Sequence, residues 1–172
     1  MIIMFNEKVV LVTGGTRGIG YTTVEEFLKE GARVILFGSR EESVTKAINS
    51  LKEKNNEYKV EGYFTDLANL EEMEKVAKEI ATKYGKIDIL VNNAGVSSST
   101  PITSYTEEEC DKIINLNIKG VFDTSKAVIP YMTGDNPSIV NVSSMVSFYG
   151  QSSGCLYPVS YTHLRAHETK AN

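Results

Sequence analysis

The sequence has few cysteines, no excess of basic residues and no long apolar run. Cys110 and Cys155 are isolated in a chain of 172 residues, which argues against a disulfide framework or zinc site and fits a reducing, cytoplasmic location. Acidic residues outnumber lysine and arginine by 22 to 18, so the charge suggests neither a nucleic acid nor an anionic membrane as partner. The apolar stretch 1–5 is too short for a signal peptide or a membrane span.

No internal repeat and no linker rich in proline, glycine or serine divides the chain. Hydrophobic residues make up 41% of the sequence and charged residues 23%, which is ordinary for a soluble globular protein. The length is sufficient for one domain with its own core.

Short apolar runs alternate with amphipathic segments along the sequence. Predicted strands lie at 9–12, 34–37, 58–64, 87–91 and 139–142, and predicted helices at 18–30, 41–54, 69–84 and 106–132. Strict alternation with nearly continuous apolar strands is typical of a parallel sheet covered by helices on both faces. We therefore predict an α/β doubly wound parallel sheet with about five strands.

A glycine-rich segment joins the first predicted strand to the first predicted helix. Residues 13–20 read TGGTRGIG, with the spacing G-x-x-x-G-x-G. Glycine permits a tight turn there and lets the backbone approach a phosphate, while the helix N-terminus offers free N–H groups. On the first strand-to-helix turn of such a sheet, this pattern indicates a dinucleotide site; the alternative is a purely structural turn.

Three motifs in order resemble the short-chain dehydrogenase/reductase family, including 3-oxoacyl-acyl-carrier-protein reductases. They are the segment 13–20, Asp66 after the third strand and 92–95 (NNAG) after the fourth, and the resemblance covers about 6–160. It implies a Rossmann fold with strand order 3-2-1-4-5 and a nicotinamide cofactor, with Asp66 at the adenine and Asn93 near the adenine ribose. Alternatively, Asp66 caps a helix or turn and Asn93 belongs to a turn that ends the strand. The cofactor-binding residues implied are Gly14, Thr16, Arg17, Gly18, Ile19, Gly20, Ser39, Arg40, Asp66, Leu67, Asn93, Ala94 and Gly95.

The end of the second strand bears on which nicotinamide cofactor is used. An NAD-selective enzyme places a carboxylate here for the ribose 2′-hydroxyl, but the chain has none before Glu41. Ser39 and Arg40 could instead hold a 2′-phosphate, helped by Arg17. We therefore expect NADP, with NAD as the alternative; the alternative for the two arginines is that they are ordinary solvated charges.

The resemblance also implies a catalytic trio of Asn117, Ser144 and Tyr157. The family's serine precedes its tyrosine by a fixed interval, which selects Ser144 rather than Ser143, and Asn117 matches the active-site asparagine in preference to Asn115. The alternative for Asn117 is a structural role, as a hydrogen-bonding residue on a helix face. In the implied reaction, hydride passes between nicotinamide and a carbonyl carbon, Tyr157 exchanges the proton and Ser144 hydrogen-bonds the oxygen.

The family's lysine, four residues after the tyrosine, lowers the tyrosine pKa and binds the cofactor ribose, but Tyr161 stands in that place. Residues 159–169 resemble a translation of the transposase adapter used in sequencing libraries. We therefore hypothesise a C-terminally truncated domain over 1–158 followed by a non-native tail over 159–172. We expect no metal site, because His163 and His167, at helical spacing, fall in that tail.

The sequence thus predicts a protein that interconverts a carbonyl and a secondary alcohol using NADP(H). Expected partners are a small-molecule substrate (a 3-oxoacyl thioester, a steroid or bile-acid-like alcohol, or a small ketone) and, for the full-length parent, further copies of itself. The alternative is a dinucleotide-binding module or sensor without catalysis. We expect the fragment itself to be inactive. The helix that carries Tyr157 would have little left to pack against, and the fifth strand would be an uncovered edge.

Overall fold

A computed structural model describes residues 4–165, with His163 and Arg165 described by their backbone alone. Five parallel strands form one sheet in the order β3-β2-β1-β4-β5, which confirms the predicted fold class and strand order. The chain crosses the sheet between β3 and β4, so the topological switch point lies between β1 and β4. The strands are β1 (Val9–Val12), β2 (Arg33–Gly38), β3 (Val60–Phe64), β4 (Ile89–Asn92) and β5 (Ser138–Asn141).

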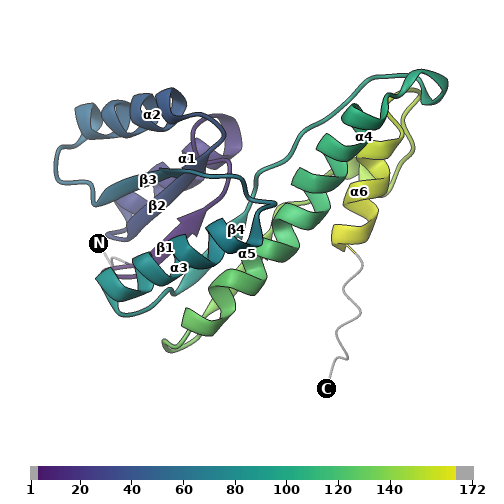
Figure 1. Ribbon diagram of the computed structural model, residues 1–172. Helices are drawn as coiled ribbons and strands as arrows, with labels where there is room; N and C mark the ends of the chain where they lie inside the picture. Colours follow the sequence, from purple (N-terminus) through teal and green to yellow (C-terminus); the bar gives the residue numbers. More distant parts are fainter. Residues whose placement is uncertain (1–3, 166–172) are drawn as a thin grey trace.

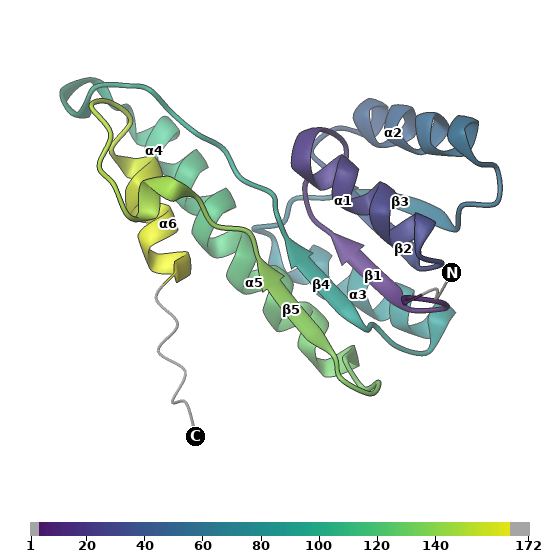
Figure 2. The same ribbon diagram turned by 180° about the vertical axis from the view of Figure 1, so that it is seen from behind.

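Helices cover both faces of the sheet, as Figures 1 and 2 show: α1 and α2 lie on one face, and α3 and α5 on the other. Beyond the sheet, α4 and α6 lie side by side in both views. The helices are α1 (Gly18–Lys29), α2 (Glu41–Lys54), α3 (Leu70–Tyr84), α4 (Glu107–Ile114), α5 (Gly120–Val128) and α6 (Leu156–Arg165).

The core follows from the alternation of side chains along the strands. Successive residues of a strand point to opposite faces, so Val10 and Val12 pack with α1 and α2, whereas Val9 and Leu11 pack with α3 and α5. All four are buried. Two apolar layers therefore share the central strands and hold their carboxyl ends in fixed positions.

A capping box stands at the start of α3. The Asn69 side chain accepts a hydrogen bond from the backbone N–H of Glu72 at 3.3 Å and donates one to the Glu72 carboxylate at 3.1 Å. At its other end α3 stops at Gly85, whose φ of 83° lies in the left-handed region that glycine adopts without a steric penalty.

The helix predicted over 106–132 is interrupted. It begins after Thr106, whose hydroxyl caps Glu109 at 3.2 Å, but a π-helical segment, Asn115–Lys119, separates α4 from α5. Such a segment inserts one extra residue per turn and is frequent at functional sites. The interruption is invisible in the apolar pattern, which continues through it.

The helix α6 crosses the boundary proposed between the domain and its tail. It packs against α4, the π-helical segment and a short 3₁₀ turn, Met145–Ser147, so Tyr157 has more to dock on than the sequence suggested. Residues 166–172, which include His167, lie outside the described residues. Among residues 4–165, no helix is long and apolar enough to cross a membrane.

Candidate active site

The glycine-rich loop follows β1 and leads directly into α1. Gly14 and Gly18 have φ values of 66° and 55°, in the left-handed region that disfavours side chains. A side chain on Gly20 would collide with the Gly14 carbonyl oxygen and come within 2.5 Å of the Asn93 amide nitrogen. The predicted glycine spacing therefore has a physical cause in both backbone conformation and close packing.

The N-terminus of α1 is open to a ligand. The position that a Cβ atom on Gly18 would take has no described atom within 4 Å, and Ile19 is 71% exposed. Within the described chain, no side chain caps this helix. The residue before it, Arg17, has an extended backbone conformation. Free N–H groups at the positive end of a helix dipole bind phosphate groups.

The end of β4 is fastened onto this loop by two side chains. The Thr13 hydroxyl accepts hydrogen bonds from the backbone N–H groups of Asn93 at 2.9 Å and Ala94 at 3.0 Å. In return, the Asn93 amide donates to the carbonyl oxygens of Thr13 at 3.0 Å and Gly14 at 3.3 Å. Asn93 therefore shapes the glycine loop, and Thr13 is a positioning residue that the sequence reasoning missed, although a hydroxyl directly before Gly14 was a possible signal.

The predicted adenosine contacts line the carboxyl ends of β2 and β3. Thr16 packs against Gly38 at the end of β2, and Ser39 and Arg40 beyond it are exposed. Neither Arg40 nor the exposed Arg17 forms an ion pair with any residue between 4 and 165. Two guanidinium groups are thus available to an anion.

The predicted adenine contact, Asp66, follows β3. Its carboxylate is exposed and accepts a hydrogen bond from the backbone N–H of Ala68 at 3.0 Å. The neighbouring Leu67 is buried against the core. This hydrogen bond fixes the direction of the Asp66 side chain and shows the turn-capping role that the sequence offered as the alternative.

The π-helical segment places Asn117 in the interior. Asn117 is 1% exposed, whereas Asn115 is exposed. The Asn117 amide nitrogen donates to the Val96 carbonyl oxygen at 2.9 Å and to the Ser160 hydroxyl at 3.0 Å, and its amide oxygen accepts from the Val96 N–H at 2.9 Å. One side chain therefore joins the chain after β4 to the helix that carries Tyr157.

Tyr157 and Tyr161 form a pair one turn apart on α6. Their ring centroids lie 4.8 Å apart with an interplanar angle of 74°, an edge-to-face arrangement that aromatic rings favour. Tyr161 is 7% exposed, and burial, followed by the charge of Tyr157 and a hydrogen bond to it, raises the pKa of Tyr161 to about 12. The Ser160 hydroxyl donates to the Tyr157 carbonyl oxygen at 2.8 Å, which completes the link from Asn117.

Ser144 begins the 3₁₀ turn after β5. Its hydroxyl accepts a hydrogen bond from the Val146 N–H at 3.4 Å, and Ser144 is half-buried where Ser143 is exposed. The turn that it caps packs against α6. Between residues 4 and 165, no hydrogen bond joins Ser144 to Tyr157, so the structure brings their two elements together without pairing the side chains.

A clamp between two loops supports this site and was not predicted. The hydroxyl groups of Ser98 and Thr100 donate to the Glu109 carboxylate at 2.5 and 2.6 Å, and these bonds lower the pKa of Glu109. The Gln151 amide donates to the carbonyl oxygens of Ser98 at 3.4 Å and Gly154 at 2.8 Å. No sequence motif marks these residues, because they come from segments about fifty positions apart.

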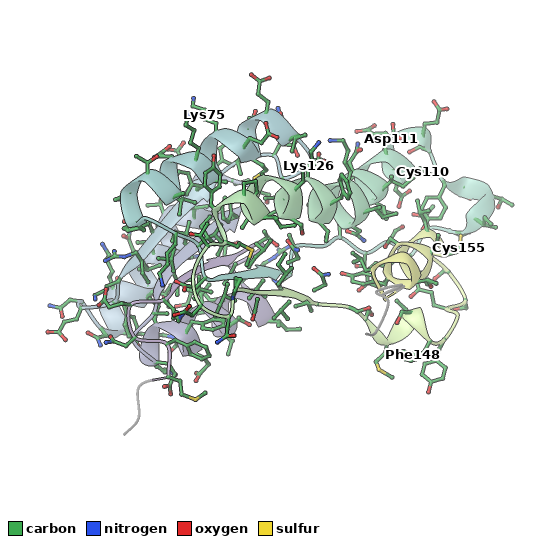
Figure 3. All side chains as sticks on the ribbon, turned by 90° about the horizontal axis from the view of Figure 1, so that it is seen from below. Lys75, Cys110, Asp111, Lys126, Phe148 and Cys155 are labelled. Atoms are coloured by element: carbon green, nitrogen blue, oxygen red, sulfur yellow. The ribbon has the colours of Figure 1, made fainter. Side chains whose placement is uncertain are left out.

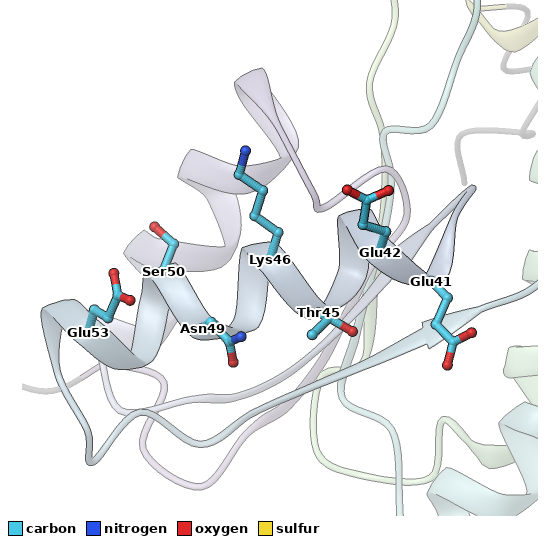
Figure 4. Close-up of a pocket in the computed structure, with 7 residues that line it drawn as sticks. All are labelled: Glu41, Glu42, Thr45, Lys46, Asn49, Ser50 and Glu53. Atoms are coloured by element: carbon cyan, nitrogen blue, oxygen red, sulfur yellow. The ribbon is translucent and has the colours of Figure 1, made fainter.

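Two other parts of the surface differ from this site. A shallow hollow lies on the outer face of α2, and Figure 4 shows that one helix supplies all of its lining. Figure 3 shows Phe148, Cys110 and Cys155 on the part of the molecule that α4 and α6 form. Polar groups from the carboxyl ends of β1 and β4 converge at the glycine loop, and Asn117 binds the chain that follows β4.

Comparisons with known proteins agree on one family. The family model described as short chain dehydrogenase matches residues 8–164. A 3alpha-hydroxysteroid dehydrogenase of Mediterraneibacter gnavus is 44% identical over 161 residues, which cover 93% of this chain and 64% of the relative. A 3-oxoacyl-acyl-carrier-protein reductase of Thermotoga maritima is 38% identical over 154 residues, covering 89% and 62%.

A solved structure shows the same arrangement. The crystal structure of an NAD⁺-bound xylitol dehydrogenase superimposes with a TM-score of 0.86 at 31% identity, over 94% of this chain and 62% of that one. The chain therefore spans less than two thirds of the length of each of these three proteins.

Proposed function

The chain belongs to the short-chain dehydrogenase family, and from that premise we propose that its parent protein is an NADP(H)-dependent oxidoreductase that interconverts a carbonyl and a secondary alcohol. The observation that supports the proposal is the Asn117 side chain, which joins Val96, in the loop after β4, to Ser160 on α6. This link ties the helix that carries Tyr157 to the chain beyond the carboxyl end of β4, where open α/β sheets bind their ligands.

The residues of the glycine loop fit a dinucleotide. Gly18 leaves open space in front of an uncapped helix N-terminus, which suits a pyrophosphate. Arg17 and Arg40 are exposed and free of ion pairs within residues 4–165, which suits a 2′-phosphate. Gly14, Gly20, Asn93, Ala94 and Gly95 would form the floor, with Thr16, Ile19, Ser39, Asp66 and Leu67 around the adenosine half.

When bound, the nicotinamide group supplies or accepts the hydride. In the proposed reaction Tyr157 gives a proton to the carbonyl oxygen, and Ser144 donates a hydrogen bond to the same oxygen. Asn117 holds α6 in place through Ser160, so it positions Tyr157. An ordinary phenol has a pKa of about 10, and Tyr161 supplies no cation that would favour release of its proton near neutral pH.

For this reason we predict negligible turnover by the 172-residue chain and propose that the parent gene encodes lysine at position 161. The proposed tail begins at Val159, two residues before this position. Sequencing the gene from native DNA provides the test: a lysine codon at 161 supports the proposal, and a genomic read that continues Tyr-Thr-His-Leu after Ser160 contradicts it.

Substrate and setting remain proposals for the parent protein. One relative is named for 3α-hydroxysteroids and the other for 3-oxoacyl groups on a carrier protein. These names support a steroid or bile-acid-like alcohol and a 3-oxoacyl thioester, beside a small ketone, as candidate substrates. We also propose a cytoplasmic, homo-oligomeric parent.

A thermal-shift titration with NADPH and NADH tests the cofactor site. We expect NADPH to raise the melting temperature more than NADH, and Arg40→Ala to reduce that difference, because the Arg40 guanidinium would pair with the 2′-phosphate that NADH lacks. Arg33→Ala, which removes an arginine from the other end of β2, is the matched control and should keep the preference. Equal shifts by both cofactors would contradict the choice of NADP.

Enzymatic assay of Tyr161→Lys tests the reaction on the chain itself. The enzyme proposal expects measurable reduction of at least one candidate ketone with NADPH, and its loss in Tyr161→Lys carrying Ser144→Ala. The same variant with Ser143→Ala should retain the activity. A chain that binds NADPH but reduces nothing in any variant would instead favour a binding module without catalysis.

A further inference from the structure

The two halves of the proposed dinucleotide site differ in how open they are. A doubly wound sheet binds one nucleotide on each side of its switch point, which here lies between β1 and β4. On the β1 side, Gly18 faces open space and Ser39 and Arg40 are exposed. Nothing in the described chain covers that half.

The β4 side is occupied by a side chain of the protein itself. The Tyr161 hydroxyl oxygen lies directly against the position that a Cβ atom on Gly95 would take, with the Asn117 amide oxygen 3.6 Å from the same position. Gly95 follows β4 at the carboxyl edge, so the phenol stands in the space next to the backbone that a second nucleotide would approach.

Tyr161 is also firmly held in that position. It is 7% exposed, its neighbour Ser160 is fully buried, and its ring packs edge-to-face on Tyr157. The Ser160 hydroxyl accepts a hydrogen bond from the Asn117 amide and donates one to the Tyr157 carbonyl oxygen. Moving the phenol away from Gly95 would disrupt the packing of the buried Tyr161 ring on the half-buried Tyr157.

We propose that this chain binds the adenosine 2′,5′-bisphosphate half of the dinucleotide, while Tyr161 closes the end of β4 to the nicotinamide nucleotide half. The inference rests on the proposed NADP(H) site. Its consequence is that NADPH gains little affinity over its own adenosine half, because the second nucleotide finds its place filled.

Isothermal titration calorimetry of the 172-residue chain with adenosine 2′,5′-bisphosphate and with NADPH tests this directly. We expect the two dissociation constants to agree within about threefold, a difference of less than about 0.7 kcal/mol. NADPH binding more than about tenfold tighter than the bisphosphate would overturn the inference while leaving the proposed function intact. Failure of both ligands to bind would overturn the inference and, with it, the proposed NADP(H) site of this chain.

Substitutions of Tyr161 test whether this side chain limits the affinity for NADPH. Tyr161→Ala should tighten NADPH binding by about tenfold or more and leave the bisphosphate affinity unchanged, which also shows that the variant is folded. Tyr161→Lys keeps a long side chain on α6, serves if the alanine variant does not fold, and should likewise favour NADPH.

The matched control is Tyr149→Ala, since Tyr149 is 67% exposed on the loop before α6. It should change neither affinity. Unchanged NADPH binding in the folded Tyr161 variants would refute the proposed closure, as would a gain in NADPH affinity from Tyr149→Ala equal to that from Tyr161→Ala.

Discussion

One row of side chains crosses the sheet and passes from a covered region into an uncovered one. Leu36, Val12, Val91 and Val140 are register partners on neighbouring strands, and their exposed fractions are 0, 0, 4 and 48%. The first three lie among residues of α1 and α2, but those helices do not reach β5. Apolar side chains of the same row are therefore buried in the core at one end and exposed to solvent at the other.

The two outer strands show the same contrast. On β3 the edge carries Glu61, which pairs with Lys83, and α2 packs beside it; charged side chains protect an edge strand from pairing with other chains. On β5, Ile139 and Val140 are exposed and no charged residue is present. The half of the sheet built from β1 to β3 is thus complete in itself, whereas β5 presents an apolar edge, as predicted from the sequence.

The largest expected effect compares two valines of the same row. Val12→Ala should lower the free energy of unfolding by about 2–3 kcal/mol, because it removes two buried methyl groups and leaves a cavity. Val140→Ala should cost less than about 0.5 kcal/mol. Urea unfolding followed by circular dichroism measures both, and equal losses would show that β5 is covered in solution.

A second substitution tests what holds α6 to the rest of the molecule. Asn117→Leu should destabilise the chain by about 2 kcal/mol, since it leaves the Val96 N–H and carbonyl groups without their partner. Amide exchange in α6 should accelerate more than exchange in β1. The exposed Asn115→Leu is the control, and protection of α6 that survives in Asn117→Leu would show that other contacts hold this helix.

At the amino ends of β1 and β4, the Asp88 carboxylate makes a pH-dependent contribution to the free energy of unfolding. Burial raises the pKa of Asp88, but the Val9 N–H and the ammonium groups of Lys86 and Lys8 outweigh it and lower that pKa overall. The stabilisation is therefore present above the unfolded pKa of about 4 and is lost as the pH falls through the lower folded value.

Asp88→Asn should accordingly cost about 1–2 kcal/mol at neutral pH, and the difference from the unsubstituted chain should shrink below about pH 4. The exposed Asp111→Asn on α4 should have little effect at either pH. Denaturant unfolding across this pH range provides the measurement, and a pH-independent difference would assign the effect to packing alone.

The smallest effect is spectroscopic and compares one tyrosine from each region. Burial and the bond to Glu79 raise the pKa of Tyr63 to about 12, and burial beside Tyr157 does the same for Tyr161. A raised phenol pKa stabilises the fold below pH 10 or so, and that contribution is lost as the pH rises towards the folded value.

Phenolate absorbance should therefore show late-titrating groups, one of them missing in Tyr63→Phe and another in Tyr161→Phe. If Tyr161→Phe instead removed an early-titrating group, Tyr161 would be solvated in solution and could not close the end of β4.

The strands and the glycine loop could be read from the sequence alone, and the resemblance to the family implied the strand order. The strands and the loop follow from local rules: nearly continuous apolar runs, amphipathic helices, and glycines where φ is positive or a backbone approaches closely. The sequence also selected Asn117 over Asn115 by resemblance to the family, and the structure places Asn117 in the interior.

Tertiary structure alone decided how the site is assembled. The π-helical segment that turns Asn117 inward, the Ser98–Glu109–Gln151 clamp and the contact of Tyr161 with Gly95 all join residues far apart in the chain. No local propensity encodes such contacts, because each depends on where two separately folded elements meet. The strands could therefore be read from the sequence, while the occupant of the space beside Gly95 could not.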